Sequence, residues 1–156
     1  MILSTDVRDA LSDLVHRYAA NVDDREFSAA AALFTDEAEL AVPDPPGELG
    51  PVRRHRGPDA IAAAVAAAAA VERTEHAIVG EVYDGAARPG TATGRVACIA
   101  HHWDRRGDEL VNVAWHLRYD DEYALTDVGW RISRRALTIN AIETGRVRRL
   151  RPHAPP

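Results

Sequence analysis

The second half of the chain alternates polar and apolar residues over four long stretches, and this pattern restricts the fold more than any other feature of the sequence. Alternation with a period of two is typical of β-strands. The four stretches are residues 75–83, 91–104, 110–123 and 130–142. Short turns rich in Gly, Asp and Pro separate them, and connections of this length join antiparallel neighbours. The sequence therefore predicts an antiparallel meander.

Helices are predicted before this meander. The first is expected to begin at Thr5 or Asp6, because either residue can cap a helix and apolar residues then recur at helical spacing. The further segments, in chain order, are a second helix at 25–33, short strands at 37–42 and 52–56, and an Ala-rich helix at 60–71. Helices followed by a long meander indicate an α+β fold with the helices on one face of the sheet.

Length and charge restrict the number of domains and the partners. A chain of 156 residues is long enough for one domain, which we expect at residues 1–145, followed by an Arg- and Pro-rich tail at 146–156. The formal net charge of −5 argues against nucleic acid as the main partner. The Arg-rich run in the tail is the local exception, and we interpret it as a solvated segment.

Other features of the composition suggest a cytoplasmic protein without a membrane partner. Cys98 is the single cysteine, so an intrachain disulfide is impossible and a reducing compartment fits best. The first residues lack the basic and apolar regions of an export signal. The longest apolar run, residues 60–71, is shorter than the roughly 20 residues that cross a bilayer.

Asp23 and His76 are the main candidates for chemistry. Asp23 lies in the turn after the first helix, where a carboxylate also serves well as the cap of the next helix. His76 lies early in the first long strand, and regular alternation would place it on the same face as Ile78 and Val82. A histidine among apolar residues is often only part of the core, but a neighbouring carboxylate turns it into an oriented acid/base group. We expect the two side chains to face each other in one apolar pocket.

Four residues on the predicted strands are candidates for substrate binding. They are His101, His116, Trp115 and Asn112. His102 is the alternative to His101, because adjacent residues of a strand point to opposite faces and only one of them can enter a pocket. Two alternatives stay open: an outward position for His116, on the outer face of the sheet, and a purely structural role for Trp115. No spacing of potential ligands predicts a metal site, so we expect no metal.

Several motifs together indicate a family. They are Leu14-Val15-His16-Arg17-Tyr18, Val22-Asp23-Asp24-Arg25, residues 32–38, His76, Trp103, residues 119–123 and Gly129-Trp130-Arg131-Ile132. In these motifs the chain resembles the SnoaL-like branch of the nuclear transport factor 2-like superfamily, from about Val7 to Glu143. The resemblance implies a cone-shaped, curved antiparallel or mixed sheet packed on three N-terminal helices, which is the cystatin-like α+β roll. It also implies a homodimer or homotrimer.

The resemblance implies an activity as well. Asp23 and His76 match the Asp-His dyad of scytalone dehydratase and hexachlorocyclohexane dehydrochlorinase, and Tyr18 resembles the tyrosine beside such a dyad in bile-acid dehydratases. In those relatives the histidine removes a proton from a substrate carbon while water or chloride leaves. A cofactor-free lyase, a dehydratase or eliminase acting on a hydrophobic small molecule, is therefore expected, with Asp23, His76 and Tyr18 as catalytic residues. The alternatives are a cyclase or isomerase with the same acid/base groups, and a non-catalytic ligand-binding or scaffold protein.

Two segments depart from particular relatives. Leu125-Thr126 stands where the dehydrochlorinase has a basic residue, which argues against chloride elimination of that type. Ala41-Val42-Pro43 stands where ketosteroid isomerases have their catalytic aspartate, which argues against isomerisation of steroid double bonds by that mechanism.

Overall fold

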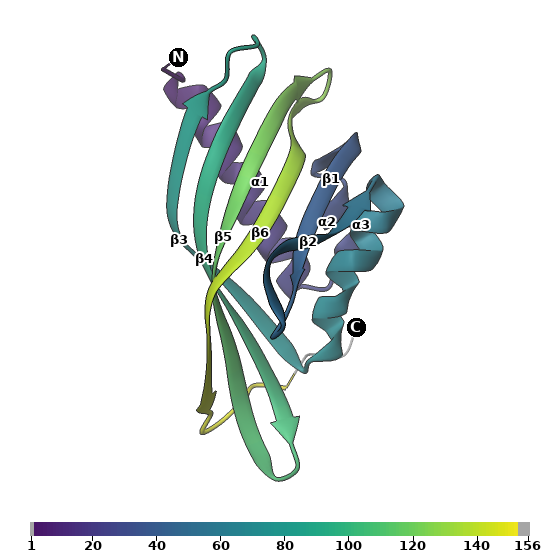
Figure 1. The fold of residues 1–156 in the computed structure, drawn as a ribbon, viewed down its shortest axis with the longest axis vertical. Helices are drawn as coiled ribbons and strands as arrows, with labels where there is room; N and C mark the ends of the chain where they lie inside the picture. The colour runs from purple at the N-terminus through teal and green to yellow at the C-terminus, as the bar shows by residue number, and fades with distance from the viewer. Residues whose placement is uncertain (1, 153–156) are drawn as a thin grey trace.

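A curved six-stranded sheet forms the body of the protein, with the helices on one side of it (Figure 1). The structure is a computed structural model that describes residues 2–152. The strands are β1 (Phe34–Asp44), β2 (Glu48–Arg56), β3 (Arg73–Gly85), β4 (Thr91–Arg106), β5 (Glu109–Thr126) and β6 (Gly129–Arg146). Their order in the sheet is β2-β1-β6-β5-β4-β3. β1 pairs in parallel with β6 and the other pairs are antiparallel, so the sheet is mixed.

Three helices precede the long strands. They are α1 (Thr5–Asp23), α2 (Phe27–Ala31) and α3 (Pro58–Val65), and a 3₁₀ segment, η1 (Ala66–Ala70), continues α3. Ser4 caps α1, one residue before the expected position, and its side-chain oxygen accepts a hydrogen bond from the backbone N–H of Val7 at 3.3 Å. α1 packs against the sheet through one buried stripe, which comprises Leu11, Leu14, Val15, Tyr18, Ala19 and Val22.

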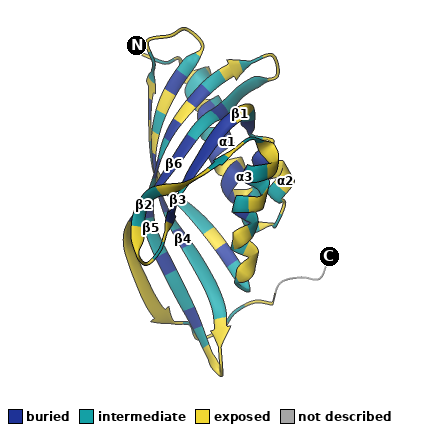
Figure 2. Cartoon of the chain, turned by 45° about the vertical axis from the view of Figure 1, so that its right-hand side comes forward, coloured by how far each residue is buried: buried dark blue, intermediate teal, exposed yellow. Residues whose placement is uncertain are grey.

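The predicted α+β class and the order of elements are confirmed. β1 extends further than expected and includes Pro43, although proline cannot donate a hydrogen bond to a neighbouring strand. This is possible because the pairing of β1 with β2 shifts register between Val42 and Asp44. Buried residues gather where the helices meet the strands, whereas the far end of the β4–β5 hairpin is exposed (Figure 2).

A bulge in β3 reverses the expected facing of half of that strand. The pairing of β3 with β4 shifts between Ile78 and Gly80, which inserts one extra residue into β3. Beyond the bulge, Val82 is 59% exposed and Tyr83 is buried. The expectation that Val82 shares the face of His76 is therefore wrong, because a one-residue insertion moves every later side chain to the opposite face.

Across residues 2–152, every helix falls short of the length and apolar character that a membrane span requires.

Gly94 on β4 offers a test of the packing. A Cβ atom there would lie 2.8 Å from Cε2 of Tyr123 and 3.0 Å from Cδ1 of Tyr83. Both rings are buried and have little room to move, so we expect Gly94→Ala to lower the free energy of unfolding by about 1–3 kcal/mol. Gly80→Ala is the matched control, because its Cβ would meet Ala97 at an ordinary 3.8 Å. Urea unfolding compares the two variants, and equal midpoints would contradict the prediction.

Candidate active site

The carboxylate of Asp23 and the imidazole of His76 are in direct contact. Asp23 ends α1 and His76 lies near the start of β3, so the pair joins two distant segments. Nδ1 of His76 lies 2.7 Å from Oδ1 of Asp23. The Thr74 hydroxyl also donates to Oδ1 (2.9 Å), and the backbone N–H of His76 donates to Oδ2 (2.8 Å). Three donors from one strand therefore hold the carboxylate in place.

These donors keep Asp23 ionised. Burial raises the pKa of a carboxyl group, because the charged form loses water. For Asp23, the hydrogen bonds from His76 and Thr74 and the charge of His76 outweigh burial, so the pKa of Asp23 lies below its usual 3.8. The ionised Asp23 carboxylate accepts a hydrogen bond from the Nδ1–H group of His76. This bond leaves Nε2 as the ring nitrogen that faces away from Asp23.

Arg25 connects the two segments that carry this pair. It follows α1 in a left-handed backbone conformation with φ of 64°, which is unfavourable for a residue other than glycine. Its guanidinium donates hydrogen bonds to the backbone carbonyl oxygens of Ala68 and Val71, just before β3. The turn after α1 is thereby bonded to the segment that leads into β3, which brings Asp23 next to His76.

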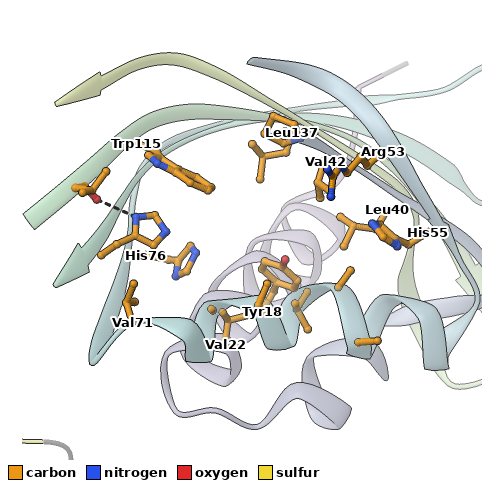
Figure 3. Close-up of a pocket in the computed structure, with 18 of the residues that line it drawn as sticks. Tyr18, Val22, Leu40, Val42, Arg53, His55, Val71, His76, Trp115 and Leu137 are labelled. Carbon is orange, nitrogen blue, oxygen red and sulfur yellow. Dashed lines mark hydrogen bonds between the residues drawn. The ribbon is translucent and has the colours of Figure 1, made fainter. Parts of the chain in front are cut away.

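His76 faces a cavity of about 530 Å³ that is lined by the sheet, α1, α3 and η1 (Figure 3). The apolar and aromatic residues around it include Tyr18, Val22, Leu40, Val42, Val65, Val71, Val113, Trp115 and Leu137. Alanines 63, 64, 67 and 68 form the wall contributed by α3 and η1. Asp23 is not among the lining residues, so a ligand would meet this pair at the His76 ring.

His102 provides a second imidazole in the cavity. Its Nδ1 donates to the backbone carbonyl oxygen of Val113 at 2.8 Å, and its ring centroid lies 6.5 Å from that of His76. Burial lowers the pKa of His102 below its usual 6.5, and the bond to Val113 only partly opposes this effect. His102 is therefore neutral at neutral pH, with Nε2 as a hydrogen-bond acceptor.

Tyr18 lies against a buried arginine. The Arg135 side chain is fully buried, and its Cζ lies 4.4 Å from the centroid of the Tyr18 ring and 4.1 Å from that of Tyr119. Asp121, also fully buried, accepts hydrogen bonds from Nε (2.8 Å) and Nη2 (2.6 Å) of Arg135. The Tyr123 hydroxyl donates to the same carboxylate at 2.7 Å. The cation is thus paired, hydrogen-bonded and enclosed by aromatic rings.

This environment determines the protonation of Tyr18. Burial raises the pKa of the Tyr18 phenol, and the positive charge of Arg135 offsets only part of the increase. The phenol is therefore protonated at neutral pH. It can donate a hydrogen bond to an oxygen in the cavity, and it cannot act as a base there.

Three of the four expected substrate-binding residues do not line the cavity. They are His101, Asn112 and His116, and only Trp115 does so. The reason is strand alternation: the inward residues of β4 near the cavity have even numbers, and those of β5 have odd numbers. His102 therefore faces inward in place of His101. Asn112 and His116 point to the opposite face, where Asn112 Nδ2 lies 2.9 Å from His101 Nδ1.

Arg135 and Asp121 are not among the site residues expected from the sequence, yet the alternation of β5 contains a signal for Asp121. On β5, Asp121 has the same parity as Leu117, Tyr119 and Tyr123, which predicts a carboxylate that points into the core. A buried carboxylate requires a charged partner or several donors, and an arginine on the neighbouring strand is the natural candidate.

The arrangement is suited to moving a proton inside an apolar space. It combines a free Nε2 on His76, a phenol donor on Tyr18 and a neutral acceptor on His102. Within residues 2–152, no group of three or more His, Cys, Asp or Glu side chains is placed to hold a metal ion.

The mixed sheet with the helices on one face is a cystatin-like fold, the fold described for a solved ntf2-like protein of Novosphingobium aromaticivorans. The sequence model of the SnoaL-like domain matches residues 4–136, so the chain belongs to the SnoaL-like family, as predicted. No curated protein matches the chain in sequence.

Solved structures show the same fold. A protein of Novosphingobium aromaticivorans, proposed to be an aromatic ring hydroxylase, matches with a TM-score of 0.76 at 21% identity, covering 94% of this chain and 96% of its own. A proposed scytalone dehydratase of Novosphingobium aromaticivorans matches with a TM-score of 0.74 at 20% identity, covering 96% and 97%. A hexachlorocyclohexane dehydrochlorinase, LinA type 2, matches with a TM-score of 0.69 at 20% identity, covering 96% and 93%. At these identities the similarity establishes the fold alone.

The buried ion pair gives a stability prediction. Asp121→Asn leaves the charge of Arg135 without a partner, and removing one member of a buried pair costs about 3–5 kcal/mol. We therefore expect this variant to lose about that much free energy of unfolding. Asp120→Asn is the matched control, because Asp120 is half-exposed and pairs with Arg118 near the surface. Chemical denaturation should show the control within about 0.5 kcal/mol of the wild type. Similar losses of free energy of unfolding in both variants would contradict the prediction, because the loss would then not depend on burial of the Arg135–Asp121 pair.

Proposed function

We propose that the protein is a cofactor-free lyase that eliminates water, or a comparable leaving group, from a hydrophobic small molecule. One observation carries the proposal. The Asp23 carboxylate holds the imidazole of His76, whose side chain is only 11% exposed, and leaves Nε2 free in an apolar cavity. A base in this position can remove a proton from a carbon that a neighbouring carbonyl group has made acidic.

In the proposed elimination, His76 is the only protein group that gains and loses a proton. Nε2 of His76 takes the proton from the carbon next to the carbonyl group. The electrons of that C–H bond form the new C=C bond as the C–O bond on the adjacent carbon breaks. The imidazolium then returns its proton to the departing oxygen, which leaves as water. Asp23 stays ionised throughout and stabilises the imidazolium while it exists.

Tyr18 and His102 would act on the oxygens of the substrate. The Tyr18 phenol, which is protonated because it is buried, would donate a hydrogen bond to the carbonyl oxygen as negative charge develops on it. Nε2 of neutral His102 would accept a hydrogen bond from the hydroxyl group that leaves. Such a bond would direct the lone pairs of that oxygen away from His102 and toward protonated His76.

The names of two similar solved structures support this reaction class. One structural neighbour is named as a proposed scytalone dehydratase and another as a hexachlorocyclohexane dehydrochlorinase, and both names describe eliminations. The apolar lining of the cavity favours a hydrophobic substrate. A cyclase or isomerase would use the same proton transfers and would differ in its product.

The acid/base pair can be tested with conservative variants. His76→Gln and Asp23→Asn keep the shape of each side chain but remove the base or its orienting charge. We expect each to lower kcat by about 10²- to 10⁴-fold, the usual contribution of positioned proton transfer. The assay follows formation of conjugated enones from a panel of aromatic β-hydroxyketones by ultraviolet absorbance, together with exchange of the acidic C–H in D₂O.

Matched controls come from the exposed part of α1. His16→Gln and Asp13→Asn make the same chemical changes on exposed side chains, outside the residues that line the cavity, and should leave kcat unchanged. Full activity in either dyad variant would exclude the mechanism. Saturable binding of these compounds to the wild type, without turnover or C–H exchange, would instead identify a ligand-binding protein.

A further inference from the structure

The cavity has a second polar end, remote from His76. Arg53 and His55 of β2 line it there, next to Leu40 and Val42. Figure 3 shows these residues on the side of the cavity opposite His76, with apolar side chains between the two ends. A ligand that fills the cavity would therefore meet an acid/base group at one end and two basic side chains at the other.

The basic residues of β2 are divided between two faces. Arg54 and Arg56 each approach Glu39 to 3.2 Å, so both side chains are directed to a carboxylate outside the cavity lining. Arg53 and His55 alternate with these arginines and face the cavity instead. Of the basic residues of β2, Arg53 and His55 therefore belong to the cavity lining, and Arg54 and Arg56 do not.

The cavity-facing pair retains unused hydrogen-bond donors. Nη2 of Arg53 bonds to Asp44 at 2.7 Å, whereas its Nε and Nη1 have no partner within residues 2–152. His55 is half-buried and has neither a carboxylate nor another hydrogen-bond partner in the same range. The other charged lining residues, Asp104 and Arg106, have opposite charges and lie on β4 beyond His102, whereas the lining at β2 contains two basic residues and no acidic one. The end at β2 is therefore suited to a negative charge.

We propose that Arg53 and His55 bind an anionic oxygen group of the substrate, a carboxylate or an ionised phenol. The inference rests on the proposed function, because that function places the reacting carbon of the substrate at His76. It adds the chemical class of the substrate. The substrate is a small apolar molecule with an anionic oxygen group at the end remote from the bond that breaks. Guanidinium and imidazole donors form strong, charge-assisted hydrogen bonds with such oxygens. Elsewhere along the apolar walls an anion would lose water without compensation.

Paired ligands test the inference by isothermal calorimetry at pH 8. The pairs are 2-naphthoate with methyl 2-naphthoate, and 4-nitrophenolate with 4-nitroanisole, so that each anion has a neutral counterpart of similar shape. We expect the anion of at least one pair to bind about tenfold more tightly than its counterpart, the effect of one charge-assisted hydrogen bond. The pair that shows the preference distinguishes a carboxylate from a phenolate. Equal or weaker binding of both anions would overturn the proposal.

Variants locate the effect within the cavity. Arg53→Gln combined with His55→Gln should reduce the anion preference to about one, while the neutral ligands keep their affinity. Arg54→Gln removes a neighbouring positive charge on the opposite face and should keep the preference. Circular dichroism and thermal unfolding confirm that each variant is folded. An equal loss of the anion preference in Arg54→Gln would mean that the preference comes from the total positive charge of β2. This result would overturn the assignment to Arg53 and His55.

The same measurement separates this inference from the proposed reaction. It is repeated on Asp23→Asn, which should keep the anion preference although turnover is lost. A wild-type protein that shows the preference but no turnover would refute the lyase and leave the binding site in place. A protein that eliminates water but shows no preference would refute the binding site alone.

Discussion

The carboxylate of Asp23 is the group on which both the site and the local fold depend. It accepts hydrogen bonds from the Thr74 hydroxyl and from the backbone and ring of His76, so it joins the end of α1 to the start of β3. Taking a carboxylate out of water is unfavourable, but hydrogen bonds to a charged group contribute roughly 1.5–3 kcal/mol each. The bonds that compensate for burial are the same ones that fix the orientation of the His76 ring. Folding and preorganisation of the site therefore share one set of contacts.

A second buried charge lies next to the cavity and acts differently. Arg135 is neutralised by Asp121, yet its guanidinium lies directly over the Tyr18 ring. Its effect in lowering the pKa of Tyr18 exceeds the opposing effect of Asp121. The phenol is consequently a better hydrogen-bond donor than burial alone would allow. Loss of water around the Tyr18 ring and the nearby cation together produce a neutral donor at the wall of an apolar space.

The outline of the fold could be predicted because it depends on local periodicity, whereas the facing of individual residues depends on strand registers. The alternating stretches gave the long strands, and Asp23 and His76 are indeed in contact. Val82 does not share the face of His76, because β3 contains a bulge, and nothing in the local pattern distinguishes a bulge from regular alternation. His102 and not His101 lines the cavity, and the sequence does not distinguish the two, because residues 96–100 are apolar at every position and show no alternation. Arg53 and His55 were not recognised, since only the tertiary structure shows that β2 borders the cavity.

The alanine-rich run explains why a hollow persists in the core. From composition alone, residues 60–71 predict a helix that packs closely on its neighbour, but the structure shows α3 and η1 lining a space of about 530 Å³. A methyl group is too short to reach across this space, and larger side chains at 63, 64, 67 and 68 would fill it. Protein interiors are normally packed without such voids, because unfilled volume loses dispersion contacts. A ligand of matching size would restore those contacts, and because His76 and the pair Arg53 and His55 lie at opposite ends of the space it would have one preferred orientation.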